Sequence, residues 1–200
     1  MDNSVFRWFN QLQVDTPALH GVASFYAVWG IAAFGILLLA AWWDARSAEE
    51  PQRAVAAVAW AGIAPLIGAL AVQLIGSAVD RARPTAVLSG THLLLEKTTD
   101  FSFPSDHGTA TAAMAVALIM AGPFLRRRWY GWVGLGLAVL MAVTRVYVGA
   151  HYPTDVLAGL ALGSVIAAAL ARPARAALTP VAAWLTRGPL RPLIAAGGTT

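Results

Sequence analysis

The chain has 200 residues, of which 58% are hydrophobic and only 12% are charged, and it contains no cysteine. A soluble domain usually carries about 25% charged residues, so this composition excludes an ordinary soluble enzyme and a disordered chain. The lack of cysteine excludes a disulfide framework and a thiolate metal site. We therefore expect an all-α, polytopic membrane helix bundle.

The first predicted element is an amphipathic helix within residues 1–21. This segment lacks the basic region and the apolar core of a signal peptide. It carries apolar side chains at helical spacing, namely Phe6, Trp8, Phe9 and Leu12. We predict that the helix lies at the membrane interface.

Five stretches free of Asp, Glu, Lys and Arg follow. A membrane-spanning helix needs roughly 20 largely apolar residues, and we predict a transmembrane helix at each stretch. The stretches are residues 22–43, 54–79, 108–125, 129–144 and 156–171. Residues 176–186 are too short to cross, and we expect them at the interface.

The basic residues predict the orientation, because arginine and lysine concentrate in cytoplasmic loops. Nine of the 14 basic residues lie in one set of loops and five in the other. The nine are Arg46, Arg53, Arg126, Arg127, Arg128, Arg172, Arg175, Arg187 and Arg191. We place these nine in the cytoplasm, which puts the loop at about 80–106 and the turn near 148–153 outside.

These expectations give one membrane-embedded domain, with an interfacial helix at 1–21, a transmembrane core at 22–172 and a cytoplasmic tail at 173–200. The net charge of +4 comes without the aromatic–basic interleaving of a nucleic-acid-binding chain. We therefore expect contacts with membrane lipids and no nucleic-acid partner. The sequence indicates no particular protein partner.

A small set of polar residues is not explained by anchoring in the membrane. They lie in three separate segments at predicted outer ends of spans, and the topology brings these ends to one membrane face. Ionisable groups at membrane depth are costly and are functional candidates. Two histidines with arginines and carboxylates indicate a site for an anion. The set is Asp80, Arg81, Arg83, Ser105, Asp106, His107, Arg145, His151 and Asp155.

The first two segments offer groups that can hold phosphate. Arg81 and Arg83 can grip it through their planar forks, although arginines at a helix end can also snorkel to lipid head groups. Ser105 is a favourable N-cap for the following span, and the N–H groups of a helix N-terminus bind anions. Asp106 lies in the same turn, and we expect its side chain to point away because a carboxylate repels phosphate.

The third segment contains a candidate nucleophile. Asp155 is expected in the first turn of the last span, from which it would reach back toward His151. A carboxylate on one imidazole nitrogen fixes the tautomer and leaves the other nitrogen as the nucleophile. Arg145 lies six residues before His151 in the same segment.

Together these residues resemble the phosphatidic acid phosphatase type 2 superfamily of integral-membrane lipid phosphatases. Its three-part signature is Lys-x6-Arg-Pro, then Pro-Ser-Gly-His, then Ser-Arg-x5-His-x3-Asp. The matching positions here, in the same order, are Arg83-Pro84, Pro104-Ser105-Asp106-His107, and Thr144-Arg145 with His151 and Asp155. The resemblance covers about residues 20–172. The Pro-Ser-Asp-His form is similar to the branch that dephosphorylates undecaprenyl diphosphate, the bacterial cell-wall lipid carrier.

Three positions depart from that signature. Gly76 stands where the family has Lys, and Arg81 or Lys97 is the candidate replacement for the missing charge. Asp106 replaces a Gly, and Thr144 replaces a Ser.

The resemblance implies a phosphatase that needs neither a metal nor another cofactor. His151 would attack the terminal phosphorus to form a phosphohistidine, Asp155 would orient His151, and His107 would protonate the leaving oxygen. The residues expected to bind the phosphate are Arg83, Ser105, Asp106, Arg145 and Arg81.

The resemblance also implies a substrate and a location. We expect a lipid phosphate, with undecaprenyl diphosphate preferred, and a place in the bacterial inner membrane with the active site facing outward. Phosphatidylglycerol phosphate, phosphatidic acid and a lipid A phosphate are alternative substrates. A catalytically lapsed lipid-binding protein is the alternative from a different class.

Overall fold

The computed structural model describes residues 1–196 and consists of helices and connecting loops over that range. Apolar composition and a high alanine content within the spans favour this outcome. The elements are α1 (Asp2–Asp15), η1 (Pro17–Leu19), α2 (His20–Ala45), α3 (Pro51–Val79), α4 (Pro84–Val87), α5 (Asp106–Ala121), η2 (Gly122–Phe124), α6 (Trp129–Tyr147), α7 (Pro153–Leu185) and α8 (Arg191–Ile194).

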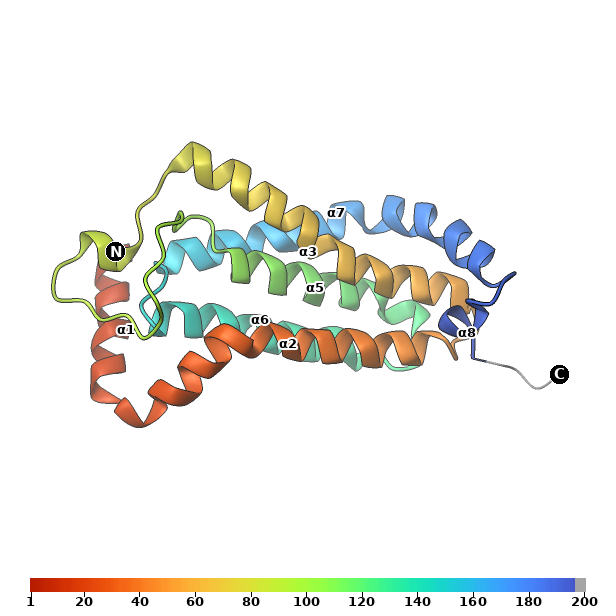
Figure 1. Cartoon of the computed structure of the whole chain (residues 1–200), viewed down its shortest axis with the longest axis horizontal. Coiled ribbons are helices and arrows are strands. Elements are labelled where there is room, and N and C mark those ends of the chain that lie inside the picture. The colour runs from red at the N-terminus through yellow and green to blue at the C-terminus, as the bar shows by residue number, and fades with distance from the viewer. Residues whose placement is uncertain (197–200) are drawn as a thin grey trace.

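Five helical segments of the described chain are long and apolar enough to cross a membrane, which confirms the predicted number of spans. Their bounds are Pro17–Ala45, Pro51–Val87, Asp106–Phe124, Trp129–Tyr147 and Pro153–Leu185. The five long helices α2, α3, α5, α6 and α7 run along the length of the molecule (Figure 1). The predicted fold class, an all-α membrane bundle, is thus confirmed.

Helix α5 occupies the centre of the bundle and packs against α3, α6 and α7 (Figure 1). Two glycines of α7 permit its close approach. A Cβ at Gly159 would lie 2.5 Å from the carbonyl oxygen of Ser105, and one at Gly163 would collide with the backbone of Thr109. Small residues let membrane helices pack closely, and here they hold the start of α5 against the start of α7.

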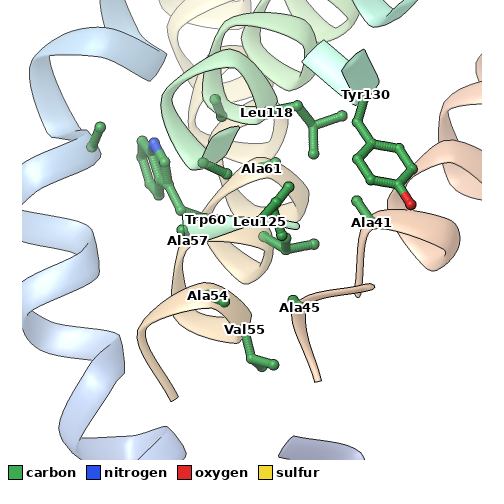
Figure 2. Close-up of a cluster of buried hydrophobic side chains, with 14 of the residues drawn as sticks. Ala41, Ala45, Ala54, Val55, Ala57, Trp60, Ala61, Leu118, Leu125 and Tyr130 are labelled. Carbon is green, nitrogen blue, oxygen red and sulfur yellow. The ribbon is translucent and has the colours of Figure 1, made fainter. Parts of the chain in front are cut away.

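A core of alanines and larger apolar side chains closes the end of the bundle at which α2 leads into α3. Figure 2 shows Trp60 and Leu118 among alanines of α2 and α3. The Trp60 indole Nε1 donates a hydrogen bond to the carbonyl of Ala167 at 3.0 Å, so its one polar atom is satisfied inside this core. The polar residues singled out above lie at the opposite end.

Helix α1 lies across that opposite end, which we call the α1 end (Figure 1). A helix within residues 1–21 is confirmed. Its buried side includes the fully buried Phe6 and two amides, Asn10 and Gln13. Gln13 donates to the carbonyl of Tyr147 at 3.0 Å, so α1 is tied to the end of α6.

Helix α7 extends beyond the residues expected for the last span. We expected the span to end near residue 171, with a separate interfacial segment at 176–186, but α7 continues without interruption to Leu185 through Pro173 and Pro180. Alanine has the highest helix propensity, and this part of the chain is rich in it. A 33-residue helix is about 50 Å long, more than the hydrocarbon thickness of a bilayer. The expected cytoplasmic tail therefore begins inside α7, and its last residues, 197–200, lie outside the described chain.

Candidate active site

The three polar segments meet at the α1 end of the bundle. The first follows α3, the second leads into α5, and the third joins α6 to α7. Arg83 from the first segment and Arg145 from the third approach the same nitrogen of His151, at 3.3 and 3.5 Å. The backbone N–H of Ser105 in the second segment donates to the carbonyl of Asp155 at 3.0 Å. The juxtaposition expected from the topology is therefore present.

His151 is buried with one nitrogen committed to a structural hydrogen bond. Its side chain is 1% exposed, and Nδ1 lies 2.8 Å from the backbone carbonyl oxygen of Ser102. Because a carbonyl only accepts, Nδ1 carries the proton in the neutral ring, and Nε2 keeps a lone pair. Burial lowers the pKa of His151, and the charges of Arg145 and Arg83 lower it further against the opposing effect of Asp155 and Asp106. The ring is held as a neutral base with Nε2 facing the two arginines.

Asp155 supports His151 through Ser102. The carboxylate reaches back as expected, but its Oδ2 is 3.8 Å from Nδ1, beyond hydrogen-bond distance. Oδ2 instead accepts from the Ser102 hydroxyl at 2.5 Å and from the backbone N–H of Tyr152 at 2.9 Å. Ser102 thus contacts both members of the pair, with its hydroxyl on Asp155 and its carbonyl on His151. The sequence did not single out Ser102, because an uncharged serine in a loop gives no signal.

Arg81 does not lie where we expected it. Its guanidinium NH1 donates to Asp155 Oδ1 at 2.6 Å, and NH2 donates to Asp2 Oδ2 at 2.6 Å. The fork also lies 3.9 Å over the ring of Tyr152. This arginine is used by two carboxylates behind His151, and the phosphate contact expected of it is not part of the function proposed below.

Arg83 is held with one nitrogen toward His151. Its Nε and NH2 form a bidentate pair with Asp100 at 3.0 Å each, and NH1 donates to the carbonyl of Ala150 at 2.9 Å. Burial acts to raise the pKa of Asp100, but the hydrogen bonds and charge of Arg83 outweigh this effect and lower that pKa. Asp100 therefore stays charged and fixes the direction of the fork.

Arg145 is buried with few hydrogen-bond partners. It is 7% exposed, its NH1 is 3.4 Å from the carbonyl of Ala27, and its Nε has no partner within residues 1–196. An unsatisfied buried donor is unusual and requires an explanation. A guanidinium with spare donors beside a histidine lone pair is suited to receive an anion.

The side chain of Asp106 points into the site, which corrects our expectation that it would point away. Its Oδ1 lies 3.0 Å from Nδ1 of His107 and 3.8 Å from Nε2 of His151. The contact with the His107 ring and the positive charge of Arg145 hold the carboxylate here. Asp106 therefore links the two histidines across one space.

Ser105 acts as the N-cap of α5. Its hydroxyl accepts from the backbone N–H of Gly108 at 3.3 Å, and the side chain is fully buried. This cap leaves the positive end of the α5 dipole directed at the site. The side chain of Ser105 is not on the wall of the cavity described next.

A cavity of about 910 Å³ opens over these residues. Its polar wall contains Arg83, Asp106, His107 and Arg145, and its apolar wall includes residues 93–95 of the loop and Ala27 and Val28 of α2. His151 lies just behind Arg83 and Arg145. Lys97, Glu96 and Asp100 also line it, so the cavity combines a wall of mixed charge with an apolar side. This pattern suits a ligand with a charged head and an apolar tail.

The cavity also accounts for the missing lysine. Gly76 is buried against Phe101, and a Cβ at position 76 would come within 2.9 Å of that ring. A lysine there would displace Phe101. Lys97 lines the cavity, whereas Arg81 does not.

Over residues 1–196, no group of three or more His, Cys, Asp or Glu side chains is placed to hold a metal ion.

Comparisons with known proteins show which family the chain matches. The family model of the PAP2 superfamily matches residues 57–177. The undecaprenyl-diphosphatase BcrC of Bacillus subtilis is 30% identical over 166 residues, 83% of this chain and 80% of the relative. An undecaprenyl-diphosphatase of Sulfolobus acidocaldarius is 43% identical over 84 residues, 42% of this chain and 39% of the relative.

Among solved structures, the fold is similar to that of a transmembrane PAP2-type phosphatidylglycerolphosphate phosphatase from Bacillus subtilis. The TM-score is 0.58 at 19% identity, with 86% of this chain and 83% of the other covered. At this identity the likeness concerns the fold alone.

Proposed function

The chain belongs to the PAP2 superfamily of membrane lipid phosphatases, and from this premise we propose that it converts undecaprenyl diphosphate to undecaprenyl phosphate. The observation that carries the chemistry is the pairing of a neutral, buried His151 with an Arg145 that has donors to spare. A nucleophile beside an unsatisfied cation is what phosphoryl transfer requires.

In the first step, Nε2 of His151 attacks the terminal phosphorus in line. The N–P bond forms as the bond from phosphorus to the bridging oxygen breaks, and undecaprenyl phosphate leaves. The negative charge of Asp155 balances the positive charge that develops on the ring. Ser102 links the two groups by its hydrogen bonds to both. In the second step, water attacks the phosphohistidine, and inorganic phosphate is released.

His107 serves as the acid and then the base. It protonates the leaving oxygen in the first step and takes a proton from the water in the second. Its Nδ1 is engaged by Asp106, so its Nε2 is the nitrogen available for these transfers. Asp106, which replaces the glycine of the usual signature, is therefore assigned the role of orienting His107.

The phosphoryl oxygens are held by Arg83, Arg145 and the first N–H groups of α5. Both arginines contact Nε2 of His151 and line the cavity, so a phosphate bound by Arg145 and by NH1 of Arg83 would lie near Nε2. Lys97 on the cavity wall supplies the charge that the family's lysine would bring. We propose no phosphate contact for Ser105, whose role is to cap α5, and none for Arg81.

The relatives support the choice of a prenyl diphosphate, since two of them are undecaprenyl-diphosphatases. The apolar wall on α2 would accept the start of the prenyl chain. The basic residues of the opposite loops support an outward-facing site in the bacterial inner membrane.

The test is phosphate release by the purified, full-length protein in detergent with EDTA present. We expect release from undecaprenyl diphosphate, and we expect His151→Ala to abolish it. His20→Ala is the matched control, since its Nε2 contacts the carbonyl of Gln13 in α1, and His20 does not line the cavity. Faster turnover of phosphatidylglycerol phosphate, phosphatidic acid or a lipid A phosphate would overturn the assignment of undecaprenyl diphosphate as the substrate. No turnover of any of them would indicate a lapsed, lipid-binding protein.

A further inference from the structure

The N-terminal helix α1 lies outside the residues matched by the family model, which begin at position 57. It nevertheless makes direct contacts behind the candidate active site. Oδ2 of Asp2 accepts from Arg81 NH2 and from the hydroxyl of Thr154, each at 2.6 Å, and Oδ1 accepts from the backbone N–H of Thr154 at 3.1 Å. The first turn of α1 is thereby fastened to the start of α7.

Arg81 connects Asp2 to the site, because its two terminal nitrogens serve two different carboxylates. NH2 donates to Asp2, while NH1 donates to Asp155 Oδ1 at 2.6 Å. Asp155 is fully buried, and Arg81 is its cationic partner. A buried carboxylate is stable only when it is paired and hydrogen-bonded. The orientation of Asp155 therefore depends on a guanidinium whose other end is held by Asp2.

The path continues from Asp155 to the nucleophile. The second oxygen of Asp155 receives the hydroxyl hydrogen of Ser102, and the carbonyl of Ser102 receives the Nδ1 hydrogen of His151. Each link is a direct hydrogen bond, so a displacement of Arg81 reaches His151 through two intermediates. No group on this path lines the cavity.

The remaining contacts of α1 fix where Asp2 lies. Phe6 is fully buried with its ring 5.6 Å from that of Tyr152. Asn10 donates to the carbonyl of His92 at 2.7 Å and accepts from its N–H at 2.9 Å. Burial acts to raise the pKa of Asp2, but hydrogen bonds from Thr154 and Arg81 outweigh this effect and lower that pKa, so the carboxylate is charged near neutral pH. A charged Asp at the start of a helix is also favoured by the helix dipole.

We propose that Asp2 is a positioning residue of the phosphatase, which holds Arg81 on Asp155 and so fixes His151 for attack. Helix α1 is then a working part of the active site as well as a membrane-associated segment. This inference rests on the proposed function, in which His151 is the nucleophile.

The test compares Asp2→Asn with Asp15→Asn in the full-length protein. Asp15 is the matched control: it lies on the same helix, and its carboxylate accepts from Gln11 on the exposed side. We expect Asp2→Asn to lower kcat about tenfold with KM unchanged, because one charge-assisted hydrogen bond is lost outside the cavity. Asp2→Glu, which keeps the charge, is expected to retain most of the activity. Asp15→Asn is expected to match the wild type.

A double variant separates positioning from general destabilisation. In an Arg81→Gln background, Asp2→Asn should cause no further loss of kcat, because the path is already broken. Additive losses, a change confined to KM, or an unchanged kcat in Asp2→Asn would overturn the proposal. If Asp2→Asn does not fold, Thr154→Val removes one donor to Asp2 and one acceptor of Arg81 NH1, and it should lower kcat several-fold with KM unchanged. An unchanged kcat in Thr154→Val would then overturn the proposal.

Failure of the proposed function would be seen separately, as absence of turnover in the wild type or full turnover in His151→Ala. The path from Asp2 to His151 can then be tested without an activity assay, by the ¹⁵N NMR signals of the His151 ring. We expect a single Nδ1–H tautomer in the wild type and in Asp15→Asn, and a mixture in Asp2→Asn. A single tautomer in all three would overturn the proposal.

Discussion

His151 donates its Nδ1 hydrogen to the backbone carbonyl of Ser102, while the hydroxyl of the same serine donates to Asp155. One loop residue therefore sets both the tautomer of His151, the proposed nucleophile, and the direction of the Asp155 carboxylate. Loops that carry function need such fixed contacts with the helices around them. Here the loop is also tied to α6 by the bond from Leu94 N–H to the carbonyl of Val148 at 3.0 Å.

Replacing Ser102 by Ala removes the hydroxyl and keeps the carbonyl. Asp155 loses one of its hydrogen bonds, and we expect kcat to fall about tenfold with little change in KM. Steady-state kinetics on the purified variant measures this effect. Ser77→Ala is the matched control, because that hydroxyl donates within α3 to the carbonyl of Leu74. Wild-type kcat in Ser102→Ala would mean that Asp155 needs no help from the loop.

Arg145→Lys keeps the charge and loses the fork. A lysine supplies one point of contact where two were available, so we expect kcat/KM to fall by about 10² or more. The matched change Arg126→Lys, on a loop at the opposite end of the bundle, should leave kcat/KM at the wild-type value. A loss of less than threefold in Arg145→Lys would contradict a phosphate-holding role.

Asp106→Asn tests the orientation of His107. The amide keeps an oxygen near Nδ1 but loses the charge-assisted hydrogen bond that orients the ring, and we expect kcat to fall about tenfold. Asp80→Asn is the control, since Asp80 is a C-cap in the left-handed region that asparagine also tolerates. An increase in kcat after Asp106→Asn would show that the carboxylate instead obstructs phosphate.

The pH profile tests the state of His151. Its attacking form is the neutral ring, and burial lowers its pKa from the ordinary value of 6.5. Activity is therefore kept at pH 6.5 and lost only as the pH falls further, when the ring becomes protonated. Measurement of kcat/KM against pH should give an acid limb with its midpoint below 6.5. A midpoint above 6.5 would mean that the carboxylates raise the pKa of His151 by more than burial and the arginines lower it.

The sequence predicted the fold well because membrane helices are marked by composition. Five uncharged stretches sufficed to locate α2, α3, α5, α6 and α7. The end of α7 was missed because the uncharged stretch was ended before Arg172, whereas the alanine-rich helix continues past this arginine and through Pro173 and Pro180.

The site was predicted in outline, because few charges in an apolar chain are conspicuous. Their contacts could not be predicted, since side-chain direction is not encoded in spacing. Arg81 and Arg83 are two residues apart, yet one serves Asp155 and the other faces His151. Asp106 was misjudged from repulsion alone. Ser102 carries no charge and stood outside every motif.

The most direct measurement of the central claim is detection of the phosphoenzyme. The His107→Gln variant is mixed with undecaprenyl diphosphate labelled at its terminal phosphorus, quenched in alkali and analysed by mass spectrometry. Undecaprenyl phosphate is already a good leaving group, so the first step should survive the loss of the acid while the second, which lacks its base, stalls. We predict label on His151 and none in the His151→Ala/His107→Gln variant. Label on another residue, or turnover with no phosphoenzyme, would contradict the account.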